Sequence, residues 1–524
     1  MCLFYRWRSL ISGSLGSSDA YYTMRIPGEA ALLRFLLGTA FCLLWVGFMG
    51  DRLHVINPAT DTLIKELTID DRAVVTAKAQ QARAAQPRWA GRPLSDRIER
   101  VRTFRDLLVE REAKLAETLT AETGKPISQS LNELRATPRR IDFFLGQTAA
   151  VIEPVLPYRE PASALPGTGD LEEVMTYEPL GVVANISAWN YPYFIGTNVF
   201  IPALLTGNTV LYKPSEVASM TGLAIAQLMK DADIPDDVFV PVIGDGATGA
   251  ALLEQPLDGV FFTGSYGTGQ KIAAAAAQQL IPVQLELGGK DPAYVCDDVD
   301  GTSVAVALAD GAFYNNGQSC CAVERIYVQA SVYDEFIESF VNTVNGFVMG
   351  DPSHSDTYLG PMSRKPQLDV LERQVKDAVE KGATVLCGGE RVSVGLPGRN
   401  PYCPGWYFQP TVLVNVGHSM AVMTEETFGP VIGIQKVESD AEAIALMNDT
   451  PYGLTAAVYS ANRERAVNIL KPIRSGTAYW NCCDRISPYL PWTGRGHSGY
   501  GSTLSTEGIR AFVQPRSWHL RSAS

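Results

Sequence analysis

Two side chains with catalytic potential lie 34 residues apart, the carboxylate of Glu286 and the thiol of Cys320. Glu286 begins the segment Glu286–Lys290 (ELGGK), in which two glycines allow a sharp backbone turn after a predicted strand. A carboxylate at a strand end in an α/β sheet faces the crevice where ligands bind, and it can act as a general base. Taken alone, Glu286 is interpreted equally well as an ion-paired structural residue.

Cys320 closes the segment Asn315–Cys320 (NNGQSC), and a second cysteine, Cys321, follows it directly. A cysteine after Gly-Gln can be held on a tight turn near a helix, with its sulfur presented rather than packed. An isolated buried cysteine is more often inert. The combination with Glu286 favours nucleophilic catalysis, because a thiolate and a general base can divide the work of forming and hydrolysing a covalent intermediate.

Two further segments have residue types that suit a dinucleotide. Phe262–Gly269 (FTGSYGTG) predicts a glycine-rich turn between a strand and a helix, where backbone N–H groups and the helix dipole can hold a pyrophosphate. Its glycines are spaced G-x-x-G-x-G rather than G-x-G-x-x-G, so a plain connection is an equally good interpretation. Lys213–Glu216 (KPSE) ends an earlier predicted strand, where the carboxylate of Glu216 can accept both ribose hydroxyls and disfavour a 2′-phosphate; an ordinary charged loop is the alternative.

The elements that must position these segments alternate between strands and helices. Short apolar runs predict strands at 181–187, 209–213, 238–243, 259–263 and 283–287, and helices at 218–231, 247–254 and 267–280 separate the last four. Nearly continuous apolar strands are typical of a parallel sheet covered on both faces, so the sequence predicts a doubly wound α/β architecture. Further runs predict a second α/β unit, at 293–296, 324–329, 384–387 and 431–436.

Upstream of this sheet the apolar period changes. Residues 71–85 and 95–120 have apolar positions at intervals of three and four, which predicts two surface helices, the second with Ser95 as its N-cap. Residues 154–169 are punctuated by proline and glycine and predict a loop or an arm.

Together with four more motifs, these segments resemble the aldehyde dehydrogenase superfamily over about residues 55–501. The four motifs are Ala188–Pro192 (AWNYP), Glu425–Pro430 (EETFGP), Tyr452–Thr455 (YGLT) and Pro491–Gly494 (PWTG). The resemblance implies an α/β fold with a Rossmann-type cofactor domain (51–155 and 177–288), an α/β catalytic domain (289–490) and a small β oligomerisation arm (156–176 and 500–517). In the family such an arm joins subunits, so the resemblance also implies a homodimer or homotetramer.

The resemblance further implies oxidation of an aldehyde to a carboxylic acid with NAD, through a thiohemiacetal and a thioester on Cys320. In this interpretation Glu286 activates the hydrolytic water and Asn190 donates to the oxyanion. The residues implied in cofactor binding are Trp189, Lys213, Glu216, Gly264, Ser265, Gly269, Glu426 and Phe428. Glu216 makes NADP the less favoured cofactor. The alternatives are a coenzyme A-acylating aldehyde dehydrogenase and a non-catalytic structural relative.

The residues around the substrate do not select an aldehyde. Ala188 replaces a proline and Trp492 a phenylalanine that are common in the family, and both changes affect the shape of the pocket. By position, five residues of mixed polarity are expected at its mouth: Tyr191, Asn198, Ser319, Cys321 and Ile486.

Composition excludes several other functions. The 524 residues include 56 acidic and 44 basic side chains and have a net charge of −12, which argues against a nucleic-acid partner. The nine cysteines are too irregular for a disulfide framework, and none of the five histidines is spaced as a helical metal pair, so no metal is expected. Reduced thiols are typical of a cytoplasmic protein.

Residues 1–50 differ from the rest of the chain. They contain an apolar run at 30–50 of about 20 residues, near the length that crosses a bilayer. A signal anchor is one interpretation, and it would make the protein membrane-anchored. A dispensable extension ahead of a true start at Met49 is the other, and a third role remains open.

Overall fold

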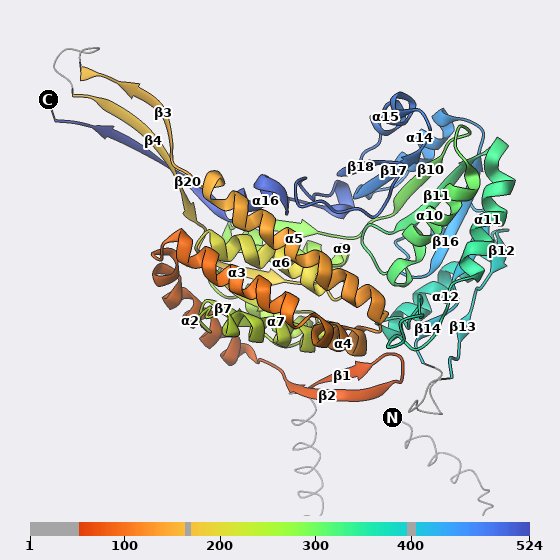
Figure 1. Cartoon of the computed structure of the whole chain (residues 1–524), viewed down its shortest axis with the longest axis horizontal. Helices are drawn as coiled ribbons and strands as arrows, with labels where there is room; N and C mark the ends of the chain where they lie inside the picture. The colour runs from red at the N-terminus through yellow and green to blue at the C-terminus, as the bar shows by residue number, and fades with distance from the viewer. Residues whose placement is uncertain (1–51, 163–168, 396–404, 524) are drawn as a thin grey trace, which may run out of the picture. The chain divides into compact units, whose positions relative to one another are not determined.

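The computed structural model describes residues 52–162, 169–395 and 405–523. They form two large sheets flanked by helices, with a small third sheet that runs away from both (Figure 1). Among these residues no helix combines the length and the apolar character that a membrane span requires. The apolar run at 30–50, and with it the predicted anchor or extension, lies outside the described residues.

The first large sheet has six strands in the order β19-β9-β8-β5-β6-β7. The five strands from β9 to β7 are parallel, and only β19 is antiparallel to its neighbour. The strands are β5 (Val182–Ile186), β6 (Thr209–Lys213), β7 (Phe239–Pro241), β8 (Gly259–Thr263), β9 (Val283–Glu286) and β19 (Gly499–Tyr500). The helices between them are α6 (Pro192–Leu205), α7 (Ser219–Asp231), α8 (Gly246–Leu253) and α9 (Tyr266–Gln279). This is the predicted doubly wound sheet, and every residue of β5, β6 and β8 is buried.

Four helices precede this sheet along the chain, after the hairpin of β1 (Arg52–Asn57) and β2 (Thr62–Thr68). They are α2 (Arg72–Ala90), α3 (Leu94–Glu110), α4 (Glu112–Thr123) and α5 (Ile127–Val151). The single helix predicted at 95–120 is therefore wrong, because the chain breaks at Arg111 into α3 and α4. Ser95 is also not the N-cap: α3 starts one residue earlier, and Pro93 occupies the cap without a side-chain hydrogen bond. Helix α5 packs against α6 and contributes to the same apolar core.

The second large sheet has seven strands in the order β12-β15-β16-β11-β10-β17-β18, and only β12 is antiparallel. It forms the predicted second α/β unit. Its strands are β10 (Asp291–Val295), β11 (Val323–Gln329), β12 (Thr384–Cys387), β15 (Thr411–Val414), β16 (Val431–Val437), β17 (Thr455–Tyr459) and β18 (Thr477–Trp480). Its helices are α10 (Gly301–Phe313), α11 (Tyr333–Asn345), α12 (Lys365–Glu380), α13 (Ala421–Thr424), α14 (Asp440–Asn448) and α15 (Arg463–Leu470). The short strands β13 (Arg391–Val392) and β14 (Tyr407–Phe408) pair with each other.

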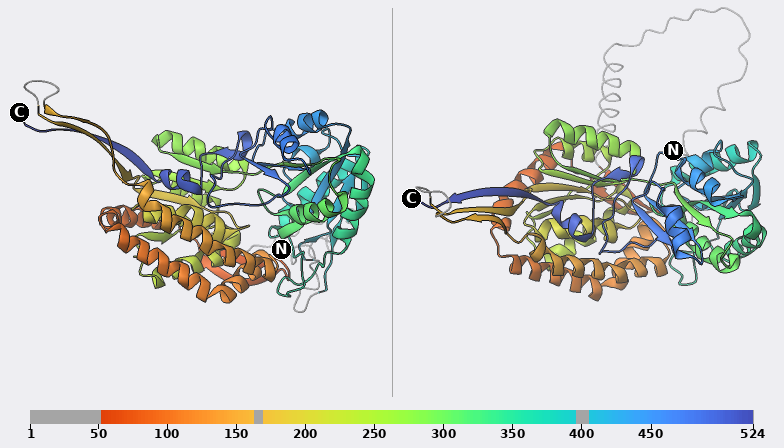
Figure 2. Two further views of the ribbon diagram at one scale, coloured as in Figure 1. Left: turned by 45° about the horizontal axis from the view of Figure 1, so that its top comes forward. Right: turned by 90° about the horizontal axis from the view of Figure 1, so that it is seen from above.

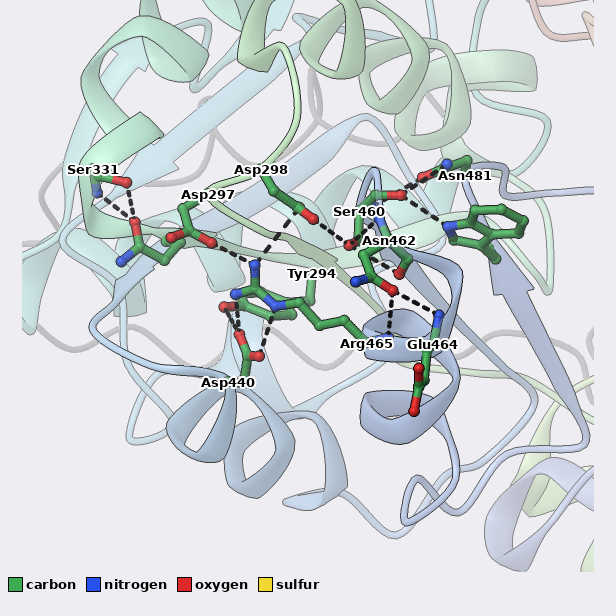
Figure 3. Close-up of polar contacts among 12 residues, drawn as sticks. Tyr294, Asp297, Asp298, Ser331, Asp440, Ser460, Asn462, Glu464, Arg465 and Asn481 are labelled. Atoms are coloured by element: carbon green, nitrogen blue, oxygen red, sulfur yellow. Dashed lines mark hydrogen bonds and ion pairs between the residues drawn. The ribbon is translucent and has the colours of Figure 1, made fainter.

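Arg465 joins α14 and α15 to the end of β10 (Figure 3). Its guanidinium donates to both carboxylate oxygens of Asp440 at 2.7 and 2.8 Å and to Asp297 at 2.6 Å. The hydroxyl of Tyr294, on β10, donates to Asp440 at 2.8 Å. Two-pronged Arg–carboxylate contacts fix direction as well as distance, so this network holds α14 and α15 against the end of β10.

The third sheet is antiparallel, in the order β20-β4-β3, and runs outward from the first large sheet (Figures 1 and 2). It consists of β3 (Val155–Glu160), β4 (Leu171–Pro179) and β20 (Val513–Arg521). It overlaps the predicted arm at 156–176 and 500–517 without coinciding with it. The helix α16 (Ser505–Arg510) lies before β20, and its Ile509 is buried in the same core as α5.

Candidate active site

Cys320 follows a turn with an unusual backbone. After α10 ends, three consecutive residues adopt left-handed conformations, Asn315 (φ 53°), Asn316 (φ 57°) and Gly317 (φ 66°). Only glycine adopts this region freely, and strained residues of this kind cluster at functional sites. The Asn316 side chain holds the turn by donating to the carbonyls of Gly360 and Pro361 at 2.7 and 3.0 Å. Cys320, which follows this turn, is half-buried at the margin of the apolar core.

Cys321 has a different environment from its neighbour. It is buried, and its Sγ donates to Asp484 Oδ1 at 2.9 Å. The neighbouring Cys320 thiol and burial raise the pKa of Cys321 well above the usual range. Cys321 is therefore a protonated hydrogen-bond donor, and Cys320 is the more accessible of the two thiols.

Glu286 is the last residue of β9, and its carboxylate is held by two hydroxyls. Thr503 Oγ1 donates to Oε1, and Thr263 Oγ1 donates to Oε2 at 3.2 Å. Burial raises the pKa of Glu286, and the two hydrogen bonds only partly oppose this effect. A carboxylate with a raised pKa is suited to general base work near neutral pH.

The glycine after this carboxylate lets two chain segments approach closely. A Cβ atom on Gly289 would lie 2.8 Å from the backbone oxygen of Cys320, which is too close for any other residue without a shift. The end of β9 and the Cys320 turn are therefore side by side, as the combination of the two motifs predicts.

Asn190 lies beside the same turn. It precedes α6 by two residues, is buried, and its Nδ2 donates to the carbonyl oxygen of Gln318 at 3.1 Å. An amide nitrogen carries two N–H groups, and Asn190 uses one of them for Gln318 and lines a cavity together with Cys320.

Two cavities meet at Cys320. The larger, of about 490 Å³, is lined by Cys320 and Glu286, and the smaller, of about 280 Å³, by Cys320 and Asn190. Of the residues that the structure describes, Cys320 alone lines both. Trp492, one of the two substituted positions, lines the larger cavity. So do all five residues expected at the substrate mouth: Tyr191, Asn198, Ser319, Cys321 and Ile486.

The smaller cavity gathers most of the residues implied in cofactor binding: Trp189, Gly264, Ser265, Glu426 and Phe428. The rings of Trp189 and Phe428 meet edge to face at 5.6 Å. Ser265 is the N-cap of α9, so the N-terminus of that helix opens toward this space. The backbone N–H of Gly264 donates to the carbonyl of Glu286 at 3.0 Å, which ties the glycine-rich turn to the end of β9.

Three of the implied cofactor residues lie outside the wall of this cavity. Lys213 ends β6, and Glu216 begins the short helix that follows, at the same sheet edge as the glycine-rich turn. Gly269 lies within α9, where a Cβ would lie 2.7 Å from the side chain of Leu287. Gly269 therefore allows close packing of α9 against the segment after β9.

A buried ion pair that was not predicted from the sequence holds the loop of Glu426 and Phe428. Lys290 Nζ lies 2.6 Å from Glu324 Oε2, and both side chains are almost fully buried. The same carboxylate accepts from the backbone N–H groups of Thr427 and Phe428 at 2.8 and 2.9 Å. Lys290 closes the ELGGK motif and offered a signal, whereas Glu324 lies beside Arg325 in a buried strand and belongs to no recognisable motif. No cluster of three possible metal ligands occurs in the described part of the chain.

Comparison with known proteins agrees with this site. Residues 45–518 match the model of the aldehyde dehydrogenase family. The chain is 33% identical to a chloroplastic betaine aldehyde dehydrogenase of Beta vulgaris, over 88% of this chain and 92% of that protein. It is 34% identical to an NADP(+) succinate-semialdehyde dehydrogenase of Deinococcus radiodurans, over 88% and 93% of the two chains.

Among solved structures, an NAD-dependent aldehyde dehydrogenase from Sinorhizobium meliloti superposes with a TM-score of 0.83. It is 31% identical in sequence, and the match covers 90% of this chain and 92% of the other. The chain therefore belongs to the aldehyde dehydrogenase family, and it is an NAD(P)-dependent oxidoreductase that converts an aldehyde to a carboxylic acid.

Proposed function

We propose that Cys320 is the nucleophile of this reaction, that Asn190 stabilises the oxyanion and that Glu286 activates the hydrolytic water. The observation that carries the proposal is the position of Cys320 at the junction of the two cavities. An aldehyde in the larger cavity and a nicotinamide in the smaller one would meet at this sulfur. Glu286 supports the assignment because it lines the larger cavity, where water and the acyl group would lie.

The steps follow from these positions. The Cys320 thiolate adds to the aldehyde carbon, a C–S bond forms, and the carbonyl electrons move to oxygen, where the second N–H of Asn190 and a backbone N–H beside Cys320 donate to the charge. The cofactor supplies a two-electron acceptor for the hydride that leaves this carbon. Glu286 then removes a proton from water, the resulting hydroxide attacks the thioester, and the Cys320 thiolate leaves as the acid forms.

The cofactor residues are assigned on the same basis. Gly264 and Ser265, at the N-terminus of α9, would hold the pyrophosphate, and Glu426 and Phe428 would contact the nicotinamide half. We propose NAD as the preferred cofactor because the Glu216 carboxylate, beyond the end of β6, would repel a 2′-phosphate. The relative from Deinococcus radiodurans is named for NADP(+), so direct measurement decides this point.

We also propose that the third sheet joins copies of this chain into a homodimer or homotetramer. Strand β3 and most of β20 are exposed and form the two edges of a three-stranded sheet, and exposed edges favour pairing with another chain. In this proposal the five parallel strands of the first sheet belong to the cofactor domain (51–155 and 177–288) and the second sheet to the catalytic domain (289–490). Light scattering of the purified protein would measure the assembly.

The protein is proposed to work in the cytoplasm, and membrane anchoring through residues 30–50 is the alternative. Fractionation of cells that make the full chain distinguishes the two. Activity in the washed membrane fraction would support the anchor, and activity in the supernatant would support the cytoplasmic assignment.

Substitution of the two neighbouring cysteines tests the proposed function. Cys320→Ser should abolish NADH formation with every aldehyde, whereas Cys321→Ser, a matched control one residue away, should retain it. Coenzyme A should not accelerate turnover, because Glu286 lies where water is activated. Substantial oxidation by the Cys320→Ser variant would overturn the assignment.

A further inference from the structure

We propose that the preferred substrates are aldehydes that carry a carboxylate, and that the buried guanidinium of Arg140 binds this carboxylate in the larger cavity. The inference rests on the proposed function, since it names the substrate class of the same site. Arg140 lies on α5 and lines the cavity that also contains Cys320 and Glu286.

Arg140 is a buried cation that no described acid pairs with. Its residue surface is only 5% exposed, and the one hydrogen bond it forms within the described residues goes to a neutral acceptor, Oδ1 of Asn198, at 3.3 Å. It forms no ion pair with any residue that the structure describes. A buried charge is costly unless it is paired, so a ligand that brings a negative charge would complete this site.

An aromatic stack holds the guanidinium in place. The Arg140 Cζ lies 3.9 Å from the ring centroid of Phe194, whose ring is parallel to that of Tyr191 within 7° at 5.9 Å. Lys125 Nζ lies 3.8 Å from the centroid of Tyr191. A guanidinium that stacks through its face keeps its N–H edge for hydrogen bonds, and this edge matches a carboxylate in a two-pronged contact.

The acids that share the cavity wall have partners of their own. Glu133 pairs with Lys125 at 2.5 Å and accepts from the backbone N–H of Tyr193 at 2.8 Å. Asp484 accepts from the thiol of Cys321. Glu286 accepts from its two threonine hydroxyls, so Arg140 is the buried charge in this wall that remains for a ligand.

Two exposed arginines extend the positive charge to the outside of the cavity. Arg139 and Arg485 both line it, and neither forms an ion pair within the described part of the chain. The protein as a whole has a net charge of −12, so this concentration of positive charge is a local feature. A cleft lined by one sign of charge raises the local concentration of substrates of the opposite sign.

The same residues argue against other substrate classes. A cationic aldehyde, of the kind named for the relative from Beta vulgaris, would place a second positive charge near Arg140. A phosphate shares the anionic chemistry of a carboxylate. We favour the carboxylate because Glu133, Glu286 and Asp484 all interact electrostatically with Arg140, and these acids would repel a doubly charged group more strongly than a singly charged one.

Aldehydes that differ in the charge at their far end test the proposal. The value of kcat/KM is measured for 4-oxobutanoate, for its neutral methyl ester, for butanal, for 4-(trimethylammonio)butanal and for glyceraldehyde 3-phosphate. We expect 4-oxobutanoate to have the highest value and the cation the lowest. Arg140→Met should lower kcat/KM for 4-oxobutanoate by about 10- to 100-fold, the usual contribution of a hydrogen-bonded charge pair. Its values for butanal and the methyl ester should fall much less, because neither aldehyde carries a carboxylate for Arg140 to bind.

The control is Arg135→Met, on the same helix, because Arg135 is exposed and contacts Glu112 outside the cavity. It should change none of the values, and Arg140→Lys should restore part of the preference for 4-oxobutanoate. Equal losses for all five aldehydes in Arg140→Met, or a wild-type preference for the ester, the cation or the phosphate, would overturn the inference. A wild-type enzyme that oxidised none of the aldehydes would instead contradict the proposed function.

Discussion

The Thr503 hydroxyl sets the pH range in which Glu286 can accept a proton, and its removal should shift thioester hydrolysis toward alkaline pH. Hydrogen bonds from Thr503 and Thr263 stabilise the carboxylate and therefore lower a pKa that burial raises. Valine has a similar shape and no hydroxyl. Thr503→Val should therefore raise the pKa of Glu286 further.

The size of the shift follows from the lost hydrogen bond. A hydrogen bond to a charged group contributes about 1.5–3 kcal/mol, and one pKa unit corresponds to about 1.4 kcal/mol. The second donor, Thr263, and the positive charge of Arg140 remain, and the larger cavity gives water access to Glu286. We therefore expect the lost hydrogen bond to contribute the lower end of this range, so that the pKa of Glu286 rises by about one unit. Because only the deprotonated carboxylate activates water, hydrolysis on the acidic side should be about tenfold slower, and the alkaline plateau should not change.

Rapid mixing with excess aldehyde and NAD separates the first turnover from the slower phase that hydrolysis limits. The rate of the slower phase is measured against pH for the wild type, for Thr503→Val and for Thr503→Ser, which retains the hydroxyl. The serine variant should keep the wild-type profile. A valine variant with an unshifted profile would refute the role of this hydrogen bond, and equal slowing at every pH would indicate lost packing instead.

Three further predictions follow from the same contacts. Glu286→Gln should give a burst of NADH near one per active site and then stall with the acyl group on Cys320, detected by mass spectrometry; unchanged steady turnover would contradict the role of the base. Glu216→Gln should reduce the ratio of kcat/KM for NAD to that for NADP, and a wild-type preference for NADP would contradict the assignment. Lys290→Met should cost about 3–5 kcal/mol in denaturant unfolding and weaken NAD binding measured by calorimetry, because Glu324 loses its buried partner. The matched exposed variant, Lys230→Met, should cost less than about 1 kcal/mol, and equal costs would contradict the prediction.

The strands of the first sheet could be predicted from the sequence because of their burial. The limits of β6 and β8 agree with the apolar runs at 209–213 and 259–263, since a parallel strand covered on both faces is apolar throughout and ends where polar residues begin. Helices α3 and α4 could not be separated in this way. Their apolar period continues across Arg111, and no glycine or proline marks the break.

The candidate site was predictable wherever its residues belong to local motifs. Glu286, Cys320 and Asn190 each have a recognisable neighbourhood of glycine, asparagine or proline, and the structure brings all three segments together. Thr503 and Glu324 could not be found in this way. Thr503 is 217 residues from Glu286 in the sequence, and a single hydroxyl at that separation leaves no local pattern.

Arg140 shows that a departure from the usual distribution of apolar and polar residues on a helix can indicate function. Arg139 and Arg140 look like the solvated face of a helix, yet Arg140 lies with Glu133, Ile141 and Phe144 on the buried side of α5. A helix that packs against its neighbours normally has apolar residues on its buried side and polar residues on its exposed side. A charge on the buried side departs from this pattern, and such departures are expected where function requires them. Glu133 violates the pattern too, but Lys125 neutralises it. Of the two buried charges on α5, the one that no described acid neutralises is therefore the one with a reason to meet a substrate.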